Sequence, residues 1–205
     1  MSKRINAKKK ISRKIGAALW GQAKDPQNKR NYRPGQHGKT SRGRVSDYGN
    51  QLRAKQKMKF YYGNISERQF YNTFVKANAL KGDVIENFIF LLESRLDAVI
   101  YRANFIPTVF AARQFVSHKH VTVNGKVVNI ASYRLKIGDV VQIREKSRNI
   151  PISLESLQKL ERDVPSYLQL DKENSSVKFL SKPEFSQVPY PVEMNPNLII
   201  EFYSR

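Results

Sequence analysis

The sequence predicts an α+β protein with three parts: a basic N-terminal arm, a mostly helical first domain, and a small module of two short helices packed on an antiparallel sheet. Residues 1–45 are rich in charge and contain several Gly and Pro residues. Residues 46–94 carry helical patterns, and an Asn-Gly pair between β-branched runs follows two further short helical patterns. The length of 205 residues suffices for one or two compact domains.

The positive charge is concentrated towards the N-terminal end. The chain has 37 Lys and Arg against 17 Asp and Glu, a formal net charge of +20. Residues 1–60 hold 18 basic and 2 acidic side chains, whereas residues 151–205 hold 6 and 8. Such an excess repels itself in a compact state, and a polyanionic partner relieves the repulsion. This uneven placement favours a nucleic-acid partner over a role in general solubility.

Several classes of protein are excluded by composition. The absence of Cys rules out disulfides and thiolate metal sites, and is compatible with a reducing cytosol. The longest apolar stretch, residues 88–92, is far shorter than a membrane span, and no apolar region of signal-peptide length follows the basic start. Walker-type, GxSxG and HExxH motifs are absent. We therefore expect no enzyme activity, no membrane contact, no metal ion and no other cofactor.

The helical domain is predicted to begin at Ser46. Good helix formers extend to residue 62, with Ser46 or Asp47 as the N-cap and Gly63 ending the helix. A second helix is predicted over 66–79, and a third, apolar enough to be buried, over 83–94. By contrast, residues 1–45 are expected to be disordered alone, or ordered only on a charged surface.

The small module follows as helix, helix and sheet. Short helices are predicted at 95–101 and, after Pro107, at 109–117. Asn124-Gly125 between two short β-branched runs predicts a hairpin, and residues 140–143 supply a further strand. One more helix is predicted over 153–162. The apolar run 198–200 is expected either to add a strand or to pack on the helical part.

Basic side chains surround a Pro-Gly-Gln-His-Gly motif in the arm. Its two Gly residues allow close approach of a partner to the backbone, and Gln36 and His37 offer donors for phosphate or base edges. A plain surface turn is the alternative, which the flanking basic residues disfavour. His118 and His120 lie too far away in sequence to favour His37 as a metal ligand. The candidate RNA contacts here are Arg33, Gln36, His37, Lys39, Arg42 and Arg44.

The first predicted helix is basic on two sides. At about 100° per residue, Arg53 and Lys57 share one side, and Lys55 and Lys59 share the opposite one. Charge on both sides suits a helix that lies between two RNA strands, and all four residues are candidate contacts. A simple solvated charged helix is the competing interpretation.

Aromatic residues offer a second kind of RNA contact. Tyr61 and Tyr62 could stack on bases, although most of the aromatic residues are more simply explained as core. Trp20 is an exception, because the basic arm provides little to bury it.

The helix–helix–sheet module carries its own set of candidate contacts. An Arg stem can be buried beside apolar residues while its guanidinium group meets a phosphate. Pairing within the protein, with Glu93 or Asp97, is the alternative, and for Arg95 it is about as plausible. The candidates are Arg95, Arg102, Arg113, Ser117, His118, Lys119 and Lys126.

A series of ordered motifs matches a known family. They are Pro34–Gly38, Ser46-Asp47-Tyr48-Gly49, Gln51-Leu52-Arg53, Lys55-Gln56-Lys57, Glu67-Arg68-Gln69-Phe70, Leu91-Leu92-Glu93, Arg95-Leu96-Asp97, Ala112-Arg113-Gln114, Val116-Ser117-His118-Lys119, Val123-Asn124-Gly125, Val127–Tyr133 and Ile143-Arg144-Glu145-Lys146. Through them, nearly the whole chain resembles the S4 family of bacterial small-subunit (30S) ribosomal proteins. The resemblance adds Tyr48 and Arg68 to the candidate RNA contacts.

The resemblance implies a domain order and a function. A helical domain at 46–93, completed by the tail 158–205, is interrupted by an S4-type RNA-binding domain at 94–157. The implied function is that of a structural constituent of the cytoplasmic ribosome. It binds a junction in the 5′ domain of 16S rRNA, nucleates small-subunit assembly and influences translational accuracy. Further implied partners are the fifth small-subunit ribosomal protein, other small-subunit proteins, and mRNA near the entrance channel.

In two respects the sequence departs from the family. Some relatives hold zinc through N-terminal Cys residues, which this chain lacks, so no zinc ion is expected. Residues 24–33 match the family pattern poorly.

Two other functions fit part of the sequence. An RNA-modifying enzyme or a synthetase would carry the small module as an appendage to a catalytic domain, for which residues outside 94–157 leave little room. A DNA-compacting protein fits the charge but not the ordered motifs. It would show no preference for folded RNA over duplex DNA.

Overall fold

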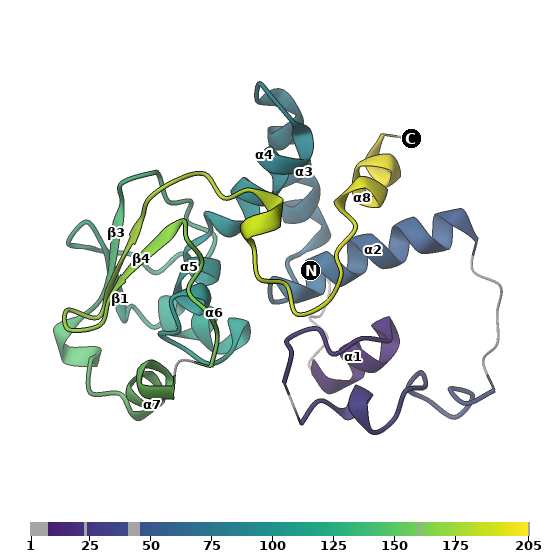
Figure 1. Ribbon diagram of the computed structural model, residues 1–205, viewed down its shortest axis with the longest axis horizontal. Coiled ribbons are helices and arrows are strands. Elements are labelled where there is room, and N and C mark those ends of the chain that lie inside the picture. Colours follow the sequence, from purple (N-terminus) through teal and green to yellow (C-terminus); the bar gives the residue numbers. More distant parts are fainter. Residues whose placement is uncertain (1–7, 23, 41–45, 160, 205) are drawn as a thin grey trace. The chain divides into compact units, whose positions relative to one another are not determined.

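The computed structural model describes residues 8–22, 24–40, 46–159 and 161–204, which fall into two compact units (Figure 1). One unit is formed by residues 1–74 together with 190–205, and the other by residues 75–189. Helices occur in both units, and an antiparallel sheet occurs in the second. The predicted α+β fold class is confirmed.

In the first unit, the central helix is α2 (Asp47–Tyr61), close to its predicted bounds. The Ser46 hydroxyl accepts a hydrogen bond from the backbone N–H of Gly49 at 3.2 Å, which caps the helix as expected. After the helix, Gly63 has a φ of 74°, a value that glycine adopts without strain.

Helix α8 (Pro196–Tyr203) packs along α2, and both are visible side by side in Figure 1. The run 198–200 is therefore helical and not a strand, and of the two expected outcomes it packs on the helical part. Pro196 occupies the first turn, where its fixed φ favours helix formation, and Ile199 is fully buried.

The arm is more ordered than its composition suggests. Helix α1 (Lys8–Ile15) buries Ile11 and Ile15, and Leu19 follows them into the same small core. The buried Ser12 hydroxyl donates to the Asp25 carboxylate at 2.7 Å, and Asp25 also caps the 3-10 turn η1 (Pro26–Asn28). Residues four apart share one helix face, so Ile11 and Ile15 lie on the same side of α1 despite the charges around them.

Helix α3 (Glu67–Ala79) also follows its predicted range, and the boundary between the two units falls within it, after Phe74. Its buried residues Phe70 and Phe74 contact the ring of Tyr203 on α8, with centroid distances of 6.4 and 5.0 Å. These contacts tie α3 to α8 within the first unit.

The second unit has a helical layer of α4 (Val84–Glu93), α5 (Leu96–Arg102) and α6 (Val109–Ser117). Asp83 caps α4 through the N–H of Ile85 at 3.1 Å, and Thr108 caps α6 through the N–H of Ala111 at 3.2 Å. Every residue of α5 is buried, so this short helix lies at the centre of the unit. Helix α7 (Pro151–Lys159) begins two residues before its predicted start. The unit also contains the 3-10 turns η2 (Glu145–Ser147) and η3 (Phe185–Gln187).

The sheet has the strand order β2-β1-β3-β5-β4, and every neighbouring pair is antiparallel. Strands β1 (Val121–Val123) and β2 (Lys126–Val127) form the predicted hairpin, and β3 (Val140–Ile143) is the predicted third strand. Asn124 and Gly125 have φ values of 49° and 76°, as expected for a two-residue turn of this kind.

Two further strands, β4 (Leu168–Asp171) and β5 (Ser176–Phe179), were not predicted. They lie in the segment 158–205, which was expected to return to the helical domain, but β5 pairs with β3 in the second unit. Only residues 190–205 of that segment belong to the unit that contains α2. The turn that connects β4 to β5 contains neither Gly nor Pro. Instead, Ser175 has a φ of 48° and the Asp171 carboxylate accepts a hydrogen bond from the N–H of Asn174.

Candidate nucleic-acid interface

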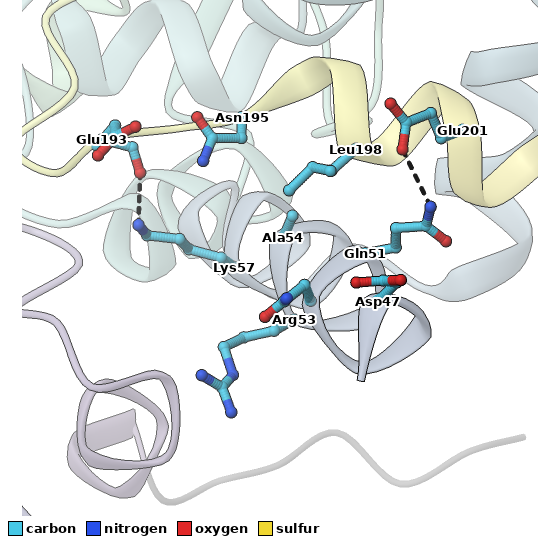
Figure 2. Close-up of a pocket in the computed structure, with 10 residues that line it drawn as sticks. Asp47, Gln51, Arg53, Ala54, Lys57, Glu193, Asn195, Leu198 and Glu201 are labelled. Atoms are coloured by element: carbon cyan, nitrogen blue, oxygen red, sulfur yellow. Dashed lines mark hydrogen bonds between the residues drawn. The ribbon is translucent and has the colours of Figure 1, made fainter. Parts of the chain in front are cut away.

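In the first unit, a hollow of about 430 Å³ lies between α2 and α8 (Figure 2). Arg53 and Lys57 line it from α2, whereas Glu193 and Glu201 line it from the C-terminal segment. Lys57 Nζ donates to the backbone carbonyl of Glu193, and Gln51 Nε2 donates to the Glu201 carboxylate at 3.0 Å. Burial lowers the pKa of Lys57, and the charge of Glu193 opposes that effect. The residues that line the hollow thus carry charges of both signs. Among them, the Arg53 side chain is half-exposed.

The two basic sides of α2 have different surroundings. Lys55 and Lys59 bind the carboxylate of Glu67 at 2.7 and 3.0 Å, and Lys55 Nζ also lies 4.1 Å from the centroid of the Phe202 ring. Since Lys55 is buried, this side of the helix is used inside the unit. Lys55 and Lys59 thus form ion pairs within the unit, whereas the Arg53 side faces the hollow, and RNA contact by Lys55 and Lys59 stays a prediction.

Glu67 is the acidic centre of this cluster. The Tyr203 hydroxyl donates to its carboxylate at 2.7 Å, in addition to the two lysines. Burial acts to raise the pKa of Glu67, but hydrogen bonds from Lys55, Tyr203 and Lys59 outweigh it and lower the pKa from 4.5 to about 2. Burial, followed by the contact with Glu67, raises the pKa of Tyr203.

The low pKa of Glu67 predicts acid sensitivity of the first unit. Its contribution to stability is present above the unfolded pKa of 4.5 and is lost as pH falls towards about 2. Because the side chain is 47% exposed, solvent screening limits the effect to about 1 kcal/mol. Urea unfolding of the wild type and Glu67→Gln between about pH 5 and pH 2 measures it. A stability difference between the two that stays constant over this range would contradict the prediction.

The loop around the Pro34–Gly38 motif, here called the arm loop, has a defined shape. Arg13 donates from Nε and Nη2 to the carbonyls of Tyr32 and Arg33, both at 3.2 Å, and its guanidinium lies 4.8 Å from the Tyr32 ring centroid. A Cβ on Gly38 would lie 1.8 Å from the Arg33 carbonyl oxygen, so this tight turn requires glycine. Arg13 was not among the predicted site residues. Its position beside the Pro-Gly motif becomes visible only when the loop folds back on α1.

The predicted contacts of the arm are well placed for a ligand where the structure describes them. Arg33, Gln36, His37 and Lys39 are all exposed on this loop. Arg42 and Arg44 lie outside the described residues. Exposed donors on a braced loop fit contact with an RNA backbone, because their positions are fixed by the turn and by Arg13.

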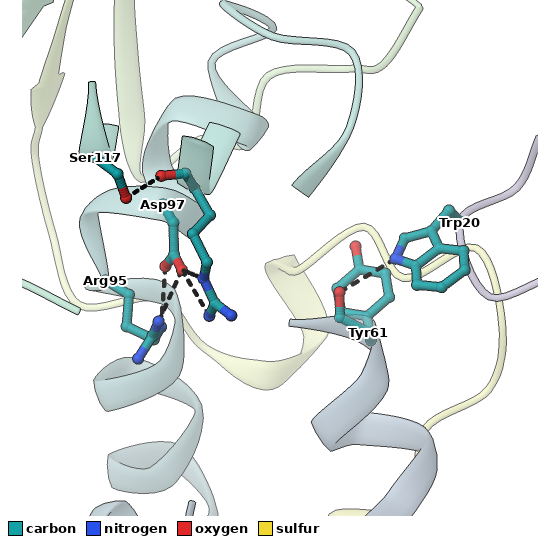
Figure 3. Close-up of polar contacts among 6 residues, drawn as sticks. Trp20, Tyr61, Arg95, Asp97 and Ser117 are labelled. Carbon is teal, nitrogen blue, oxygen red and sulfur yellow. Dashed lines mark hydrogen bonds and ion pairs between the residues drawn. The ribbon is translucent and has the colours of Figure 1, made fainter. Parts of the chain in front are cut away.

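In the second unit, Asp97 binds two arginines at the start of α5 (Figure 3). Arg95 donates from Nε at 2.9 Å and from Nη2 at 2.7 Å, and Arg113 donates from Nε at 3.2 Å and from Nη2 at 3.0 Å. The three side chains are 7%, 11% and 2% exposed for Arg95, Arg113 and Asp97. Pairing of Arg95 with Asp97, one of the two outcomes considered from the sequence, is therefore present.

Arg102 is buried in the core of the second unit. Its Nε and Nη2 donate to the Glu93 carboxylate at 3.1 and 2.8 Å, and the Tyr167 hydroxyl donates to the same carboxylate at 2.9 Å. The Arg102 side chain is 3% exposed and that of Glu93 is fully buried. The structure thus replaces the RNA contact expected of Arg102 by a buried ion pair, because α5 turns this side chain into the core.

The candidate contacts at the end of α6 and in the hairpin lie at the surface. Ser117, His118 and Lys119 are exposed, and so is Lys126 in the hairpin. The Ser117 hydroxyl donates to the backbone carbonyl of Arg113 at 2.9 Å (Figure 3). Arg68, at the start of α3, is likewise exposed.

The aromatic residues considered for stacking on RNA have different surroundings. Tyr61 and Tyr62 are core residues of the first unit, so stacking on RNA bases is not open to them, whereas Tyr48 is exposed. Trp20 is half-buried, and its indole N–H donates to the backbone carbonyl of Tyr61 at 3.2 Å (Figure 3). The expectation that little surrounds Trp20 is wrong, because the arm folds into a unit with its own core.

Arg134 was missed by the sequence analysis. It pairs with Arg95 in an isolated β-bridge, and burial, followed by the charge of Arg95, lowers its pKa. No periodic pattern marks a single arginine in a loop, so the sequence offered no signal for it. Elsewhere in the described part of the chain, no group of three or more His, Asp or Glu side chains is arranged to hold a metal ion. Nor is any described helix long and apolar enough to cross a membrane.

Comparison with known proteins identifies the family of the chain. A family model described as "Ribosomal protein S4/S9 N-terminal domain" matches residues 3–93, and one described as "S4 domain" matches residues 94–141. The small ribosomal subunit protein uS4 of Azorhizobium caulinodans is 58% identical over 205 residues, and that of Caulobacter vibrioides is 59% identical over 204. The uS4 protein of Brucella abortus is 58% identical over 205 residues. In each case 100% of both chains is covered. The chain belongs to the uS4 family of small ribosomal subunit proteins.

Proposed function

We propose that the protein binds the helical junction in the 5′ domain of 16S rRNA as a primary binding protein, nucleates small-subunit assembly there, and influences translational accuracy. Membership of the uS4 family makes it a structural, rRNA-binding protein of the ribosome and not an enzyme. The observation that carries the proposal is the display of exposed basic side chains on braced elements of both units.

The proposed contacts come from the arm loop, from the two helices that follow it, and from the S4 domain. They are Arg33, Gln36, His37, Lys39, Arg42, Arg44, Tyr48, Arg53, Lys55, Lys57, Lys59, Arg68, Arg95, Arg113, Ser117, His118, Lys119 and Lys126. Lys and Arg displace counterions from RNA phosphates, which supplies affinity. Deep A-form grooves hide base edges, so selectivity comes from the shape of the junction.

Further partners are proposed from the family resemblance. They are the fifth small-subunit ribosomal protein, other small-subunit proteins, and mRNA near the entrance channel of the cytoplasmic ribosome. The relatives are small ribosomal subunit proteins, which supports the first two.

Competition binding tests the proposal. Filter binding of the full chain to the 5′ domain of 16S rRNA is measured against an unrelated structured RNA of equal length and against duplex DNA, at two salt concentrations. We expect binding to the 5′ domain to survive both competitors and the higher salt. Equal binding to all three nucleic acids would instead support a general polyanion binder, which is the DNA-compacting alternative.

A further inference from the structure

Two arginines from separate helices share one carboxylate at the start of α5. Arg95 immediately precedes α5 and Arg113 lies on α6, yet both guanidinium groups meet Asp97 within 3.2 Å. Asp97 receives two nitrogens from each arginine, an arrangement that fixes the planes of both groups. One carboxylate therefore orients two cations but balances the charge of one.

Asp97 is itself held firmly. Its backbone N–H donates to the carbonyl of Ala131 at 3.2 Å, and the N–H of the preceding Leu96 donates to the carbonyl of Tyr133 at 2.9 Å. The bridge between Arg95 and Arg134 lies next to these contacts. An acidic side chain in the first turn of a helix is also favoured by the helix dipole. The carboxylate thus has a fixed place before any ligand binds.

Free arginine side chains have many rotamers and lose that freedom when they bind. Arg95 and Arg113 have lost it already, because their bonds to Asp97 hold them within the folded protein. Both side chains nevertheless keep some exposure, 7% for Arg95 and 11% for Arg113. A pair fixed in this way suits phosphates in one geometry better than phosphates in another.

We propose that Asp97 is a positioning residue for RNA selectivity: it holds Arg95 and Arg113 in one orientation, so that only RNA with matching phosphate geometry gains both contacts. The proposal rests on the proposed function, since it requires these arginines to face rRNA. Loss of the carboxylate removes the contacts through which Asp97 orients both side chains and adds one net positive charge. Affinity for RNA of any shape is then kept or increased, while the advantage of the correct shape falls.

The test compares Asp97→Asn with Glu93→Gln. Both variants remove a buried carboxylate from an arginine pair in the same unit and change the net charge equally, but Glu93 binds the core residue Arg102. The measured quantity is the ratio of the dissociation constant for an unrelated structured RNA to that for the 5′ domain, below both melting temperatures. Asp97→Asn is expected to lower this ratio about tenfold, the effect of one charge-assisted hydrogen bond. Glu93→Gln is expected to leave it unchanged.

Equal changes of the ratio in the two variants, or an unchanged ratio in Asp97→Asn, would overturn the positioning role. If Asp97→Asn does not fold, Arg95→Lys takes its place, because it keeps the charge and loses the two-nitrogen contact. An unchanged ratio in Arg95→Lys likewise overturns the proposal. Failure of the proposed function is seen separately, as a wild type that does not discriminate between the RNAs at all.

Discussion

Replacing Arg102 by alanine is expected to lower the free energy of unfolding by about 3–5 kcal/mol. The substitution removes two hydrogen bonds from Glu93, whose side chain is fully buried, and leaves its charge inside the second unit. It also removes the hydrogen bond from Arg102 Nη1 to the carbonyl of Pro189 at 3.0 Å. Urea unfolding of the full chain, followed by circular dichroism, measures the loss.

A surface ion pair provides the matched control. Lys159 and Glu155 lie one helical turn apart on α7, 3.9 Å from each other, with side chains 65% and 68% exposed. Lys159→Ala is expected to change stability by less than about 0.5 kcal/mol, because solvent already screens the pair. Similar losses in the Arg102 and Lys159 variants would show that burial of the Glu93 pair does not govern its energetic role.

Binding to the 5′ domain of 16S rRNA is expected to remain selective at higher salt, but its affinity is expected to fall about 10³-fold or more as salt rises from about 50 to about 200 mM. The proposed contacts include five exposed basic residues and the half-exposed Arg53, and each phosphate contact releases counterions. The exposed five are Arg33, Lys39, Arg68, Lys119 and Lys126. Filter binding over a salt series gives the slope of log affinity against log salt.

The double variant Arg53→Ala with Lys57→Ala tests how much these two residues contribute to the salt dependence of binding. It is expected to bind rRNA more weakly and to flatten the slope by about 1–2, with Arg53 contributing more because Lys57 already donates to Glu193. Lys172→Ala with Lys178→Ala removes the same charge from exposed positions outside the proposed contacts and should preserve the slope. Identical slopes in the two double variants would exclude a phosphate contact by this side of α2.

Elements with local signals were predictable from the sequence. Helix α2 has its cap at Ser46 and a terminating Gly63, and the β1–β2 hairpin has its Asn-Gly pair. Each of these signals acts through neighbouring residues, so the sequence alone determines the local structure. The β4–β5 hairpin lacked such a signal, because Ser175 and an Asp171 side-chain turn do what glycine usually does.

The candidate site shows the same limit more clearly. Lys119 and Lys126 are exposed beside turns, which agrees with their choice as candidate contacts. Whether an arginine faces solvent or a buried acid depends on which helix packs beside it. Arg102 meets Glu93 because α4 and α5 bring them together, and no spacing rule distinguishes this from the partly exposed Arg113.

The pairing of α8 with α2 has a consequence for the order of events during synthesis. Residues 75–189 are contiguous, so the second unit has all its strands and helices once Pro189 has left the peptide tunnel. The first unit, although it starts earlier in the chain, lacks the partner of α2 until residues 196–203 have emerged. At about 5–20 residues per second, α2 waits for roughly 7–28 seconds with its α8-facing side uncovered. The unit translated first is therefore the one completed last, and nascent-chain chaperones would meet α2 during that interval.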